Sequence, residues 1–252
     1  MIIKYKIYNP AGNITALVIG DKYTKEEKRL INDKIMEKEP NVEQVGFLSE
    51  EEVKITMAGG EFCGNAIRCA ILYYKLQKDT SNIKINNEFI KGGRENNNVW
   101  CSIPVEENLI SKINNKIYKV LLKDITILVV YNKVKKENLK IEAKKIIKKY
   151  NIDDIAIGVM FVDKMEKYIE MYPVVWVKEI NTFFLENSCG SGTISVSMVE
   201  NFLNINNRKY IIKQPSEEFL ETEIYLKNKK IKEVILKGEI KTDEKIRKIN
   251  LL

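Results

Sequence analysis

The chain has 252 residues, 44% of them hydrophobic and 31% charged, and it carries a net charge of +7. This composition is typical of a globular protein, and no apolar run approaches the roughly 18 residues that a membrane span requires. The positive charge comes almost entirely from lysines interleaved with Glu and Asp, which favours a solvated surface over a nucleic-acid interface. The first residues lack the uninterrupted apolar stretch of a signal peptide, so we expect a cytoplasmic protein.

The sequence contains no histidine, which removes the commonest general acid–base group and the commonest zinc ligand. Proton transfer would therefore use Cys, Asp, Glu, Lys or Tyr. The four cysteines, at positions 63, 69, 101 and 189, are too sparse for a disulfide framework and form no CxxC pair for zinc. We expect neither a metal nor a disulfide, and we expect Cys69 and Cys101 to be packed core residues.

The first half of the chain is predicted to combine strands with two different kinds of helix. Two β-branched runs, 2–8 and 14–20, flank a turn at Asn9-Pro10-Ala11-Gly12 and predict a pair of strands. A charged helical pattern follows at 21–38. The later elements are strands near 44–47, 52–57, 92–93 and 99–103, and a helix at 65–78 after the break at Gly59-Gly60. This helix is apolar on much of its circumference, which predicts that it is buried.

The second half repeats this plan after a polar segment, 105–116, that we interpret as a domain link. The predicted elements are a strand at 118–131, a charged helix at 135–150, strands near 155–162, 168–171 and 174–177, a buried helix from Cys189 to about 204, and strands near 221–226 and 233–240. The duplicated order predicts an α/β (α+β) protein of two similar domains around one shared site. We place the domains at 1–115 and 116–240.

Cys63 and Cys189 occupy the same local context, each at the start of a buried helix and directly before a glycine. The partial positive charge at a helix N-terminus stabilises a thiolate, which predicts two reactive thiols. The free N–H groups of the first helical turn also form an anion site, and small residues such as Gly64 and Gly190 allow close approach. If both helices point at one cleft, a single carboxylate can bind between them with one thiol on each side of its Cα.

Two thiols on opposite faces of a Cα suit racemisation without a cofactor. One cysteine acts as a thiolate base while the other, still protonated, returns a proton to the opposite face, and the roles exchange in reverse. Preorganised N–H donors at the helix ends would stabilise the charge that develops on the substrate carboxylate. The pair shares one proton and should titrate as a unit. The sequence therefore predicts an amino-acid racemase or epimerase acting on a small-molecule amino acid, with no cofactor.

The motifs resemble those of the diaminopimelate epimerase superfamily over most of the chain. Residues 63–69 match its pattern C-G-N-x-x-R-C, and residues 189–192 match C-G-[ST]-G, with an earlier Gly12-Asn13 and a Gln44 in equivalent places. The resemblance implies two facing domains, each with a curved sheet around a central helix, the first completed by a terminal strand at about 241–252. It implies catalytic Cys63 and Cys189 between the domains, with substrate contacts from Asn13, Gln44, Gly64, Asn65, Gly190 and Ser191.

The departures from that family concern the substrate side chain. Diaminopimelate epimerases carry a Glu-Arg-Gly segment whose arginine binds the distal carboxylate, whereas this chain has Glu179-Ile180-Asn181 and only the glutamate remains. Without a cation, a distal carboxylate would be costly to bind. With Phe183 and Phe184 nearby, the sequence resembles the histidine racemases of the superfamily, and Asp124 is a candidate acceptor for the imidazole N–H.

Three other functions stay open. A diaminopimelate or lanthionine-type epimerase would need a distal site rebuilt from other residues, and adding that substrate would reveal it. A thiol-switch ligand-binding protein would keep the fold and use the two cysteines as a redox pair, since close thiols oxidise readily. Nucleic-acid binding is the least supported, and a steep loss with salt would be its signature. Assembly as a homodimer is compatible with the sequence, which does not fix the oligomeric state.

Overall fold

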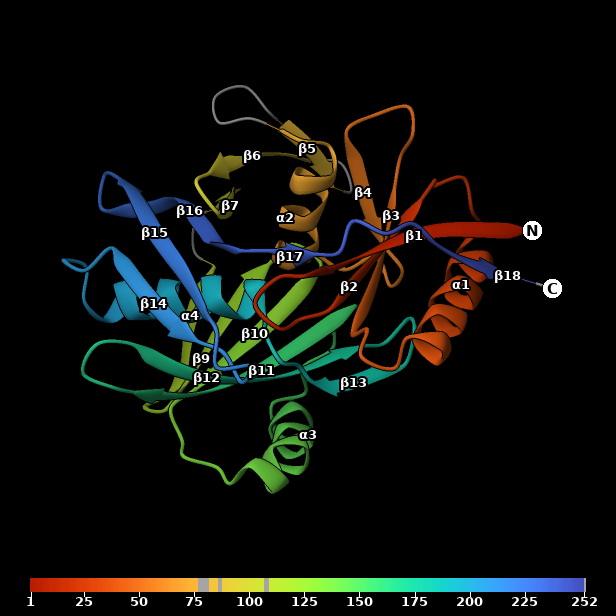
Figure 1. The fold of residues 1–252 in the computed structure, drawn as a ribbon. Coiled ribbons are helices and arrows are strands. Elements are labelled where there is room, and N and C mark those ends of the chain that lie inside the picture. Colours follow the sequence, from red (N-terminus) through yellow and green to blue (C-terminus); the bar gives the residue numbers. More distant parts are fainter. Residues whose placement is uncertain (77–81, 86–87, 107–108, 252) are drawn as a thin grey trace.

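The computed structural model describes residues 1–76, 82–85, 88–106 and 109–251 (Figure 1). It is a mixed α/β structure in which strands predominate. Its helices are α1 (Lys25–Lys38), α2 (Gly64–Tyr73), α3 (Leu139–Lys149) and α4 (Gly190–Leu203), with a short 3₁₀ helix η1 (Lys136–Asn138) before α3. Within the described residues, no helix is both long and apolar enough to cross a membrane.

One order of strand pairing occurs twice along the chain. The strands of the first set are β1 (Ile2–Asn9), β2 (Thr15–Ile19), β3 (Gln44–Leu48), β4 (Lys54–Met57), β5 (Asn82–Ile85), β6 (Glu88–Glu95) and β7 (Asn98–Pro104). Strands β1 and β2 pair antiparallel, α1 crosses to β3 parallel to β2, and β4 returns antiparallel to β3. Helix α2 then crosses to β5 parallel to β4, and β6 and β7 continue antiparallel.

The second set of strands repeats each of these steps. Its members are β8 (Ile110–Asn114), β9 (Ile117–Leu122), β10 (Ile125–Val130), β11 (Ala156–Lys164), β12 (Ile169–Val177), β13 (Thr182–Leu185), β14 (Lys209–Lys213), β15 (Phe219–Lys227) and β16 (Lys230–Glu239). Strands β9 and β10 are antiparallel, α3 crosses to β11 parallel to β10, and β12 is antiparallel to β11. Helix α4 crosses to β14 parallel to β12, followed by antiparallel β15 and β16.

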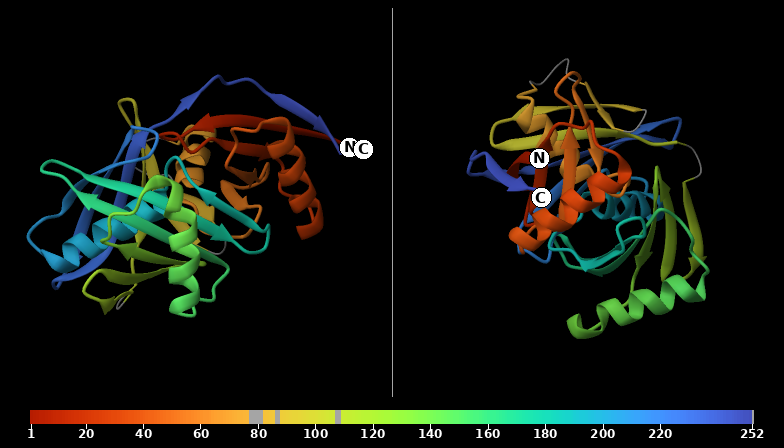
Figure 2. Two further views of the ribbon diagram at one scale, coloured as in Figure 1. Left: turned by 90° about the horizontal axis from the view of Figure 1, so that it is seen from below. Right: turned by 90° about the vertical axis from the view of Figure 1, so that its right-hand side faces the viewer.

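The two sets are joined at both ends of the molecule. Strand β16 pairs antiparallel with β7, so one sheet runs through both sets. The short strands β17 (Lys241–Thr242) and β18 (Arg247–Asn250) then return to pair with β1. The chain ends consequently lie next to each other in both views of Figure 2.

Each set of strands packs against two helices, one on each face of its sheet. This is possible because successive apolar residues of its central strands point to opposite faces. On β2, Ala16 and Val18 face α1, while Leu17 belongs to the large core that contains α2. On β11, Ile157 and Val159 pack with α3, and Met160 belongs to the core that contains α4. The exposed faces of α1 and α3 explain their charged sequences, whereas α2 and α4 are buried almost all round.

Several predicted boundaries are corrected by local backbone geometry. The helix predicted at 65–78 ends at Tyr73, because Lys75 adopts a left-handed φ of 55° and the N–H groups of Lys75 and Leu76 bond back to Leu72 and Ile71. The positions of 77 and 78 lie outside the described residues.

Three strand predictions are also corrected. The single strand predicted at 118–131 is the hairpin β9–β10, turned at Asp124 with φ 61°. The two strands predicted at 168–171 and 174–177 form one, β12. Part of the predicted link at 105–116 is strand β8, which pairs with β9.

Candidate active site

Both predicted thiols cap the N-termini of the inner helices in nearly the same backbone conformation. Cys63 precedes α2 with φ −135° and ψ 107°, and Cys189 precedes α4 with φ −133° and ψ 112°. Each sulfur accepts a hydrogen bond of 3.4 Å from the backbone N–H three residues later, at Ala66 and Gly192. The cysteines thus take the capping role that Ser or Asp usually fills, and this fixes each side chain at its helix mouth.

The two helix mouths meet because glycine follows each cysteine. A Cβ added to Gly190 would lie 3.0 Å from the Asn65 backbone nitrogen, and one added to Gly64 would lie 3.6 Å from the Gly190 carbonyl carbon. The Asn65 side chain spans the junction, donating from Nδ2 to the Ser188 carbonyl at 3.3 Å. Its Oδ1 in turn accepts from the fully buried Arg68 at 2.8 Å. The N–H groups of both first turns therefore converge on one place.

Asn13 and Gln44 join Cys63 in a single hydrogen-bond network. The Cys63 thiol donates to Gln44 Oε1 at 3.0 Å. The Gln44 amide donates to Asn13 Oδ1 and, at 2.8 Å, to the Thr15 hydroxyl. Asn13 completes the chain by donating from Nδ2 to Glu43 at 2.7 Å. The structure thus brings together three of the residues that the sequence singled out, all from the first set of strands.

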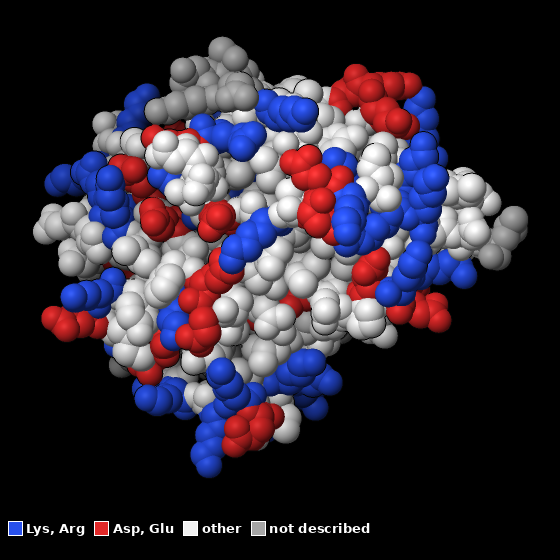
Figure 3. Space-filling model, in the orientation of Figure 1, with Lys and Arg blue, Asp and Glu red and all other residues white. Residues whose placement is uncertain are grey.

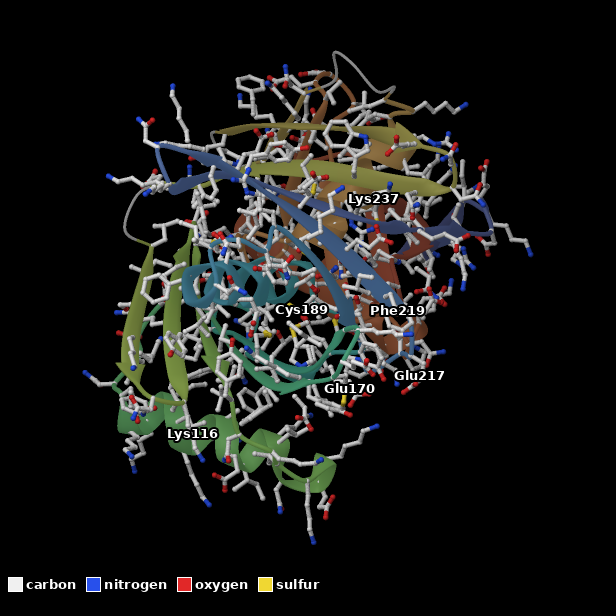
Figure 4. The ribbon with its side chains drawn as sticks, turned by 90° about the vertical axis from the view of Figure 1, so that its left-hand side faces the viewer. Lys116, Glu170, Cys189, Glu217, Phe219 and Lys237 are labelled. Atoms are coloured by element: carbon white, nitrogen blue, oxygen red, sulfur yellow. The ribbon has the colours of Figure 1, made fainter. Side chains whose placement is uncertain are left out.

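Cys189 lies in the interior at the start of α4, whereas Glu217 and Phe219 are exposed at the edge of the molecule (Figure 4). The Cys189 sulfur is 3.5 Å from the Ser191 hydroxyl, and the Cys189 backbone N–H donates to Gln214 Oε1 at 3.0 Å. Gln214 also bonds to the Thr193 hydroxyl at 3.1 Å, so it holds the entry to the helix. Ser191, a predicted substrate contact, therefore lies directly beside the second thiol.

A small cavity of about 20 Å³ is lined by three glutamates that sequence analysis missed. The cysteines are not part of its lining but contact it, since Cys63 donates to Gln44 and Glu186 interacts with Cys189. Glu43 precedes Gln44, Glu61 lies two residues before Cys63, and Glu186 lies three residues before Cys189. The other lining residues are Gln44, Val45, Ala58, Val175, Val177, Ile180, Thr182 and Phe184. The sequence did hold a signal, since a glutamate shortly precedes the Cys-Gly pair in both motifs.

The environment of the thiols raises their pKa, contrary to the expectation from the helix termini. Burial raises the pKa of Cys63 to about 12 against the hydrogen bond from Ala66, and the charges of Glu186 and Glu61 add to the rise. The pKa of Cys189 is also raised well above its usual value, first by burial and then by the charge of Glu186. Desolvation therefore exceeds the effect of the helix N-terminus, and both cysteines rest as thiols in the free protein.

The carboxyl groups are shifted in the same direction. Burial raises the pKa of Glu61 to about 7, and burial together with the charges of Glu43 and Glu61 raises that of Glu186 to about 8. Burial also raises the pKa of Glu43, against the bonds from Asn13 and Asn187. Three carboxyls around one cavity repel one another when ionised, so the site favours a ligand that brings positive charge or N–H donors.

A thiolate titration checks the electrostatics of the empty site. Because burial holds both pKa values high, the thiolate absorbance that Cys63 and Cys189 contribute should be negligible at about pH 8.5, where a free cysteine is half ionised. The measurement is the ultraviolet difference between the reduced protein and a Cys63→Ser, Cys189→Ser double variant, which cancels the tyrosine signal. An absorbance increase equal to two thiolates near neutral pH would instead mean that the helix N-termini lower the thiol pKa values more than burial raises them.

Two predicted site residues, Asp124 and Glu179, are not among the lining residues of this cavity. Asp124 is in the β9–β10 turn and Glu179 is in the β12–β13 connection. Glu179 is exposed, 3.9 Å from Lys25 Nζ, and lines a neighbouring surface pocket that shares Ala58 and Ile180 with the cavity. Among the described residues, no cluster of His, Cys, Asp and Glu could hold a metal ion.

The surface carries both signs of charge in mixture. On the face shown in Figure 3, lysine and arginine side chains alternate with aspartate and glutamate. Many of them form exposed pairs, for example Lys22 with Glu51 and Lys123 with Glu88. This arrangement agrees with the interpretation of the net charge as a solvated surface.

The fold is shared with solved structures. A phenazine biosynthesis PhzF family protein from Enterococcus faecalis superimposes with a TM-score of 0.61 at 16% identity, covering 99% of this chain and 100% of that one. A hydroxyproline epimerase from Agrobacterium vitis gives a TM-score of 0.59 at 11% identity, covering 98% and 91%. Together with the sequence relatives described next, this fold defines an isomerase of the racemase type.

Sequence comparison narrows this class to one family. The family model described as the histidine racemase CntK N-terminal domain matches residues 2–245. A histidine racemase from Fusobacterium nucleatum subsp. nucleatum is 34% identical over 225 residues, which cover 81% of this chain and 83% of that protein. The chain belongs to the histidine racemase family.

Proposed function

We propose that this protein interconverts L- and D-histidine, with Cys63 and Cys189 as the two acid–base groups and without a cofactor. The observation that carries the substrate assignment is membership of the histidine racemase family. The small cavity near the thiols agrees with it, since three glutamates line it and, among the described residues, no lysine or arginine does. Histidine brings an α-ammonium group and a ring N–H, both of which need acceptors. Diaminopimelate would place a second carboxylate against carboxylates, which is unfavourable in a buried site.

The helix mouths are the sites that we assign to the substrate carboxylate. The first N–H groups of a helix have no acceptor within the helix, and the sulfur caps take only those of Ala66 and Gly192. Donors from Gly64 and Asn65 on one side, and from Gly190 and Ser191 on the other, would bind the carboxylate and stabilise charge that develops on it. In this arrangement Cα would lie between the sulfurs.

The proton balance is that of a two-base reaction. Before the reaction one of the two thiols releases its proton to solvent. That sulfur, as thiolate, takes the α-proton and becomes a thiol, while the opposite thiol donates its proton to Cα and becomes the thiolate. The substrate ammonium compensates for the charge of the neighbouring carboxylates, which lowers the cost of forming the thiolate in the complex. A thiolate therefore forms more readily when the substrate is bound than in the empty site.

We further infer that the chain is a member of the diaminopimelate epimerase superfamily with two domains, 1–115 completed by 241–252, and 116–240. The repeated pairing order and the matching N-caps support two such units, as does the return of β17 and β18 to β1. Because β8 pairs with β9, the boundary between the units moves to before Ile110. The site then lies where the domains meet, which is a common location for small-molecule sites.

Proton NMR of the reduced protein in D₂O with separate L-amino acids tests the function. We expect loss of the α-proton signal of histidine, with chiral chromatography showing the D-form approaching an equal share. Exchange of diaminopimelate alone would contradict the substrate assignment. Tight histidine binding without exchange would instead support a thiol-switch binding protein.

A further inference from the structure

Glu61 is a buried carboxylate with an unused oxygen. Its residue is only 7% exposed, and its Oε2 atom has no hydrogen-bond partner in the described part of the chain. A buried polar atom without a partner costs stability, and native proteins keep few of them. An oxygen that is unpaired and lines a ligand cavity is explained if the ligand supplies the missing donor.

The backbone around Glu61 makes room for this carboxylate. A Cβ on Gly59 would lie 2.7 Å from Glu61 Oε2 and 2.4 Å from a methyl carbon of Val177. Glycine at this position therefore lets the carboxylate lie against strand β12, in the wall that also contains Val175, Val177 and Phe184. The oxygen is thus placed beside an apolar surface, a setting that suits the polar edge of a flat ring.

The other two carboxylates already have partners at the reacting centre. Glu43 accepts from the Asn13 amide and from the Asn187 backbone at 3.2 Å. Glu186 interacts with the Cys189 thiol. Glu61, by contrast, has an oxygen without a partner among the described residues. We therefore assign Glu43 and Glu186 to the α-ammonium and Glu61 to the end of the side chain.

We propose that Glu61 determines substrate specificity by accepting a hydrogen bond from the imidazole N–H of histidine. This role rests on the proposed function, and it adds the group that recognises the side chain. The ring would lie against the apolar wall of the cavity with its N–H towards Oε2. An amino acid whose side chain has no donor would leave the carboxylate buried and unpaired, which is how a polar site rejects an analogue.

The test compares full-length wild-type protein with Glu61→Gln, and uses Glu37→Gln on the exposed face of α1 as the matched control. Exchange of the α-proton is followed for L-histidine and for both ring N-methylated histidines. Loss of a hydrogen bond to a charged group should raise KM for histidine by about ten- to a hundredfold, with kcat changed much less. Methylation of the nitrogen that faces Glu61 should raise KM for the wild-type protein. With that methylated substrate, wild type and Glu61→Gln should then have similar KM values.

Thermal unfolding separates this role from a structural one. The folded-state pKa of Glu61, raised to about 7, lies above its unfolded value of about 4.3, so the folded state favours the protonated form. Its stabilising contribution is therefore lost as the pH rises through about 7. Glu61→Gln removes the buried charge and should keep or raise the Tm at pH 8 while it raises KM. A lower Tm, with apparent kcat reduced in proportion to the folded protein and KM unchanged, would overturn the proposal.

The outcomes also separate this role from the function itself. Wild-type protein that exchanges histidine, with a Glu61→Gln variant of unchanged KM, would overturn the role of Glu61 alone. Wild-type protein that leaves histidine unexchanged would overturn the function and this role together. A rise in KM shared by Glu37→Gln would show an effect of surface charge and would also count against Glu61.

Discussion

Replacing Cys63 or Cys189 by alanine is expected to lower kcat/KM for histidine racemisation by about 10³-fold or more, since each thiol supplies one of the two proton transfers. Neither loss should be additive with the other, because the two sulfurs act on one Cα in one step. Both cysteines also cap helices, so a small decrease in stability is expected beside the loss of activity. Cys69→Ala, a buried cysteine within α2, is the control that removes a sulfur and keeps the site.

The single variants should differ in a way that identifies each face of the substrate. With one thiol gone, the remaining sulfur can still remove the α-proton of the enantiomer that faces it and return deuterium to the same face. Each variant should therefore exchange one enantiomer slowly in D₂O without inverting it. NMR measures the exchange and chiral chromatography measures the inversion. Racemisation near the wild-type rate in either variant would exclude the two-thiol mechanism.

Gly190→Ala should have the next largest effect, about a tenfold loss of kcat/KM. Its added methyl group would lie 3.0 Å from both the backbone nitrogen and the Oδ1 of Asn65, so the mouths of α2 and α4 would have to move apart by a few tenths of an ångström. A displacement of about 1 Å at a reacting centre costs on the order of 10²-fold in rate, and a smaller displacement costs less. Gly64→Ala is the comparison, because its methyl meets chiefly the flexible end of Leu236 at 2.9 Å.

The test compares the loss of kcat/KM in the two glycine variants. A larger loss for Gly190→Ala than for Gly64→Ala, with both proteins folded by circular dichroism, supports the close contact of the helix ends as a requirement for activity. Equal and small losses would mean that the substrate carboxylate does not depend on that spacing.

The paired helices and their thiols were predictable because the signal is local. A Cys-Gly pair that opens an apolar helix needs no knowledge of distant residues, and the repeat of that pattern indicated one shared site. The sets of strands followed from β-branched runs. Turns were harder, since the left-handed conformation of Lys75 occurs at a residue type with no preference for it.

The carboxylates of the cavity were less accessible to sequence analysis. Glu43, Glu61 and Glu186 are ordinary in a chain rich in charge, and only the tertiary fold places them together. Asp124 was singled out through the resemblance, yet its turn lies elsewhere. The thiol pKa shifts were predicted with the wrong sign because burial depends on packing, and here it outweighs the helix terminus.

The near identity of the two N-caps bears on the thermodynamics of the reaction. Free enantiomers have equal energies, so the equilibrium constant is one and kcat/KM must be equal in the two directions. Matching caps at Cys63 and Cys189 present the same local geometry to both hands of the substrate. The glutamates break this pseudosymmetry and can make kcat and KM differ between the enantiomers, but only in proportion. Any mutation that lowers KM for one enantiomer relative to the other must therefore lower kcat for that enantiomer, relative to the other, by the same ratio.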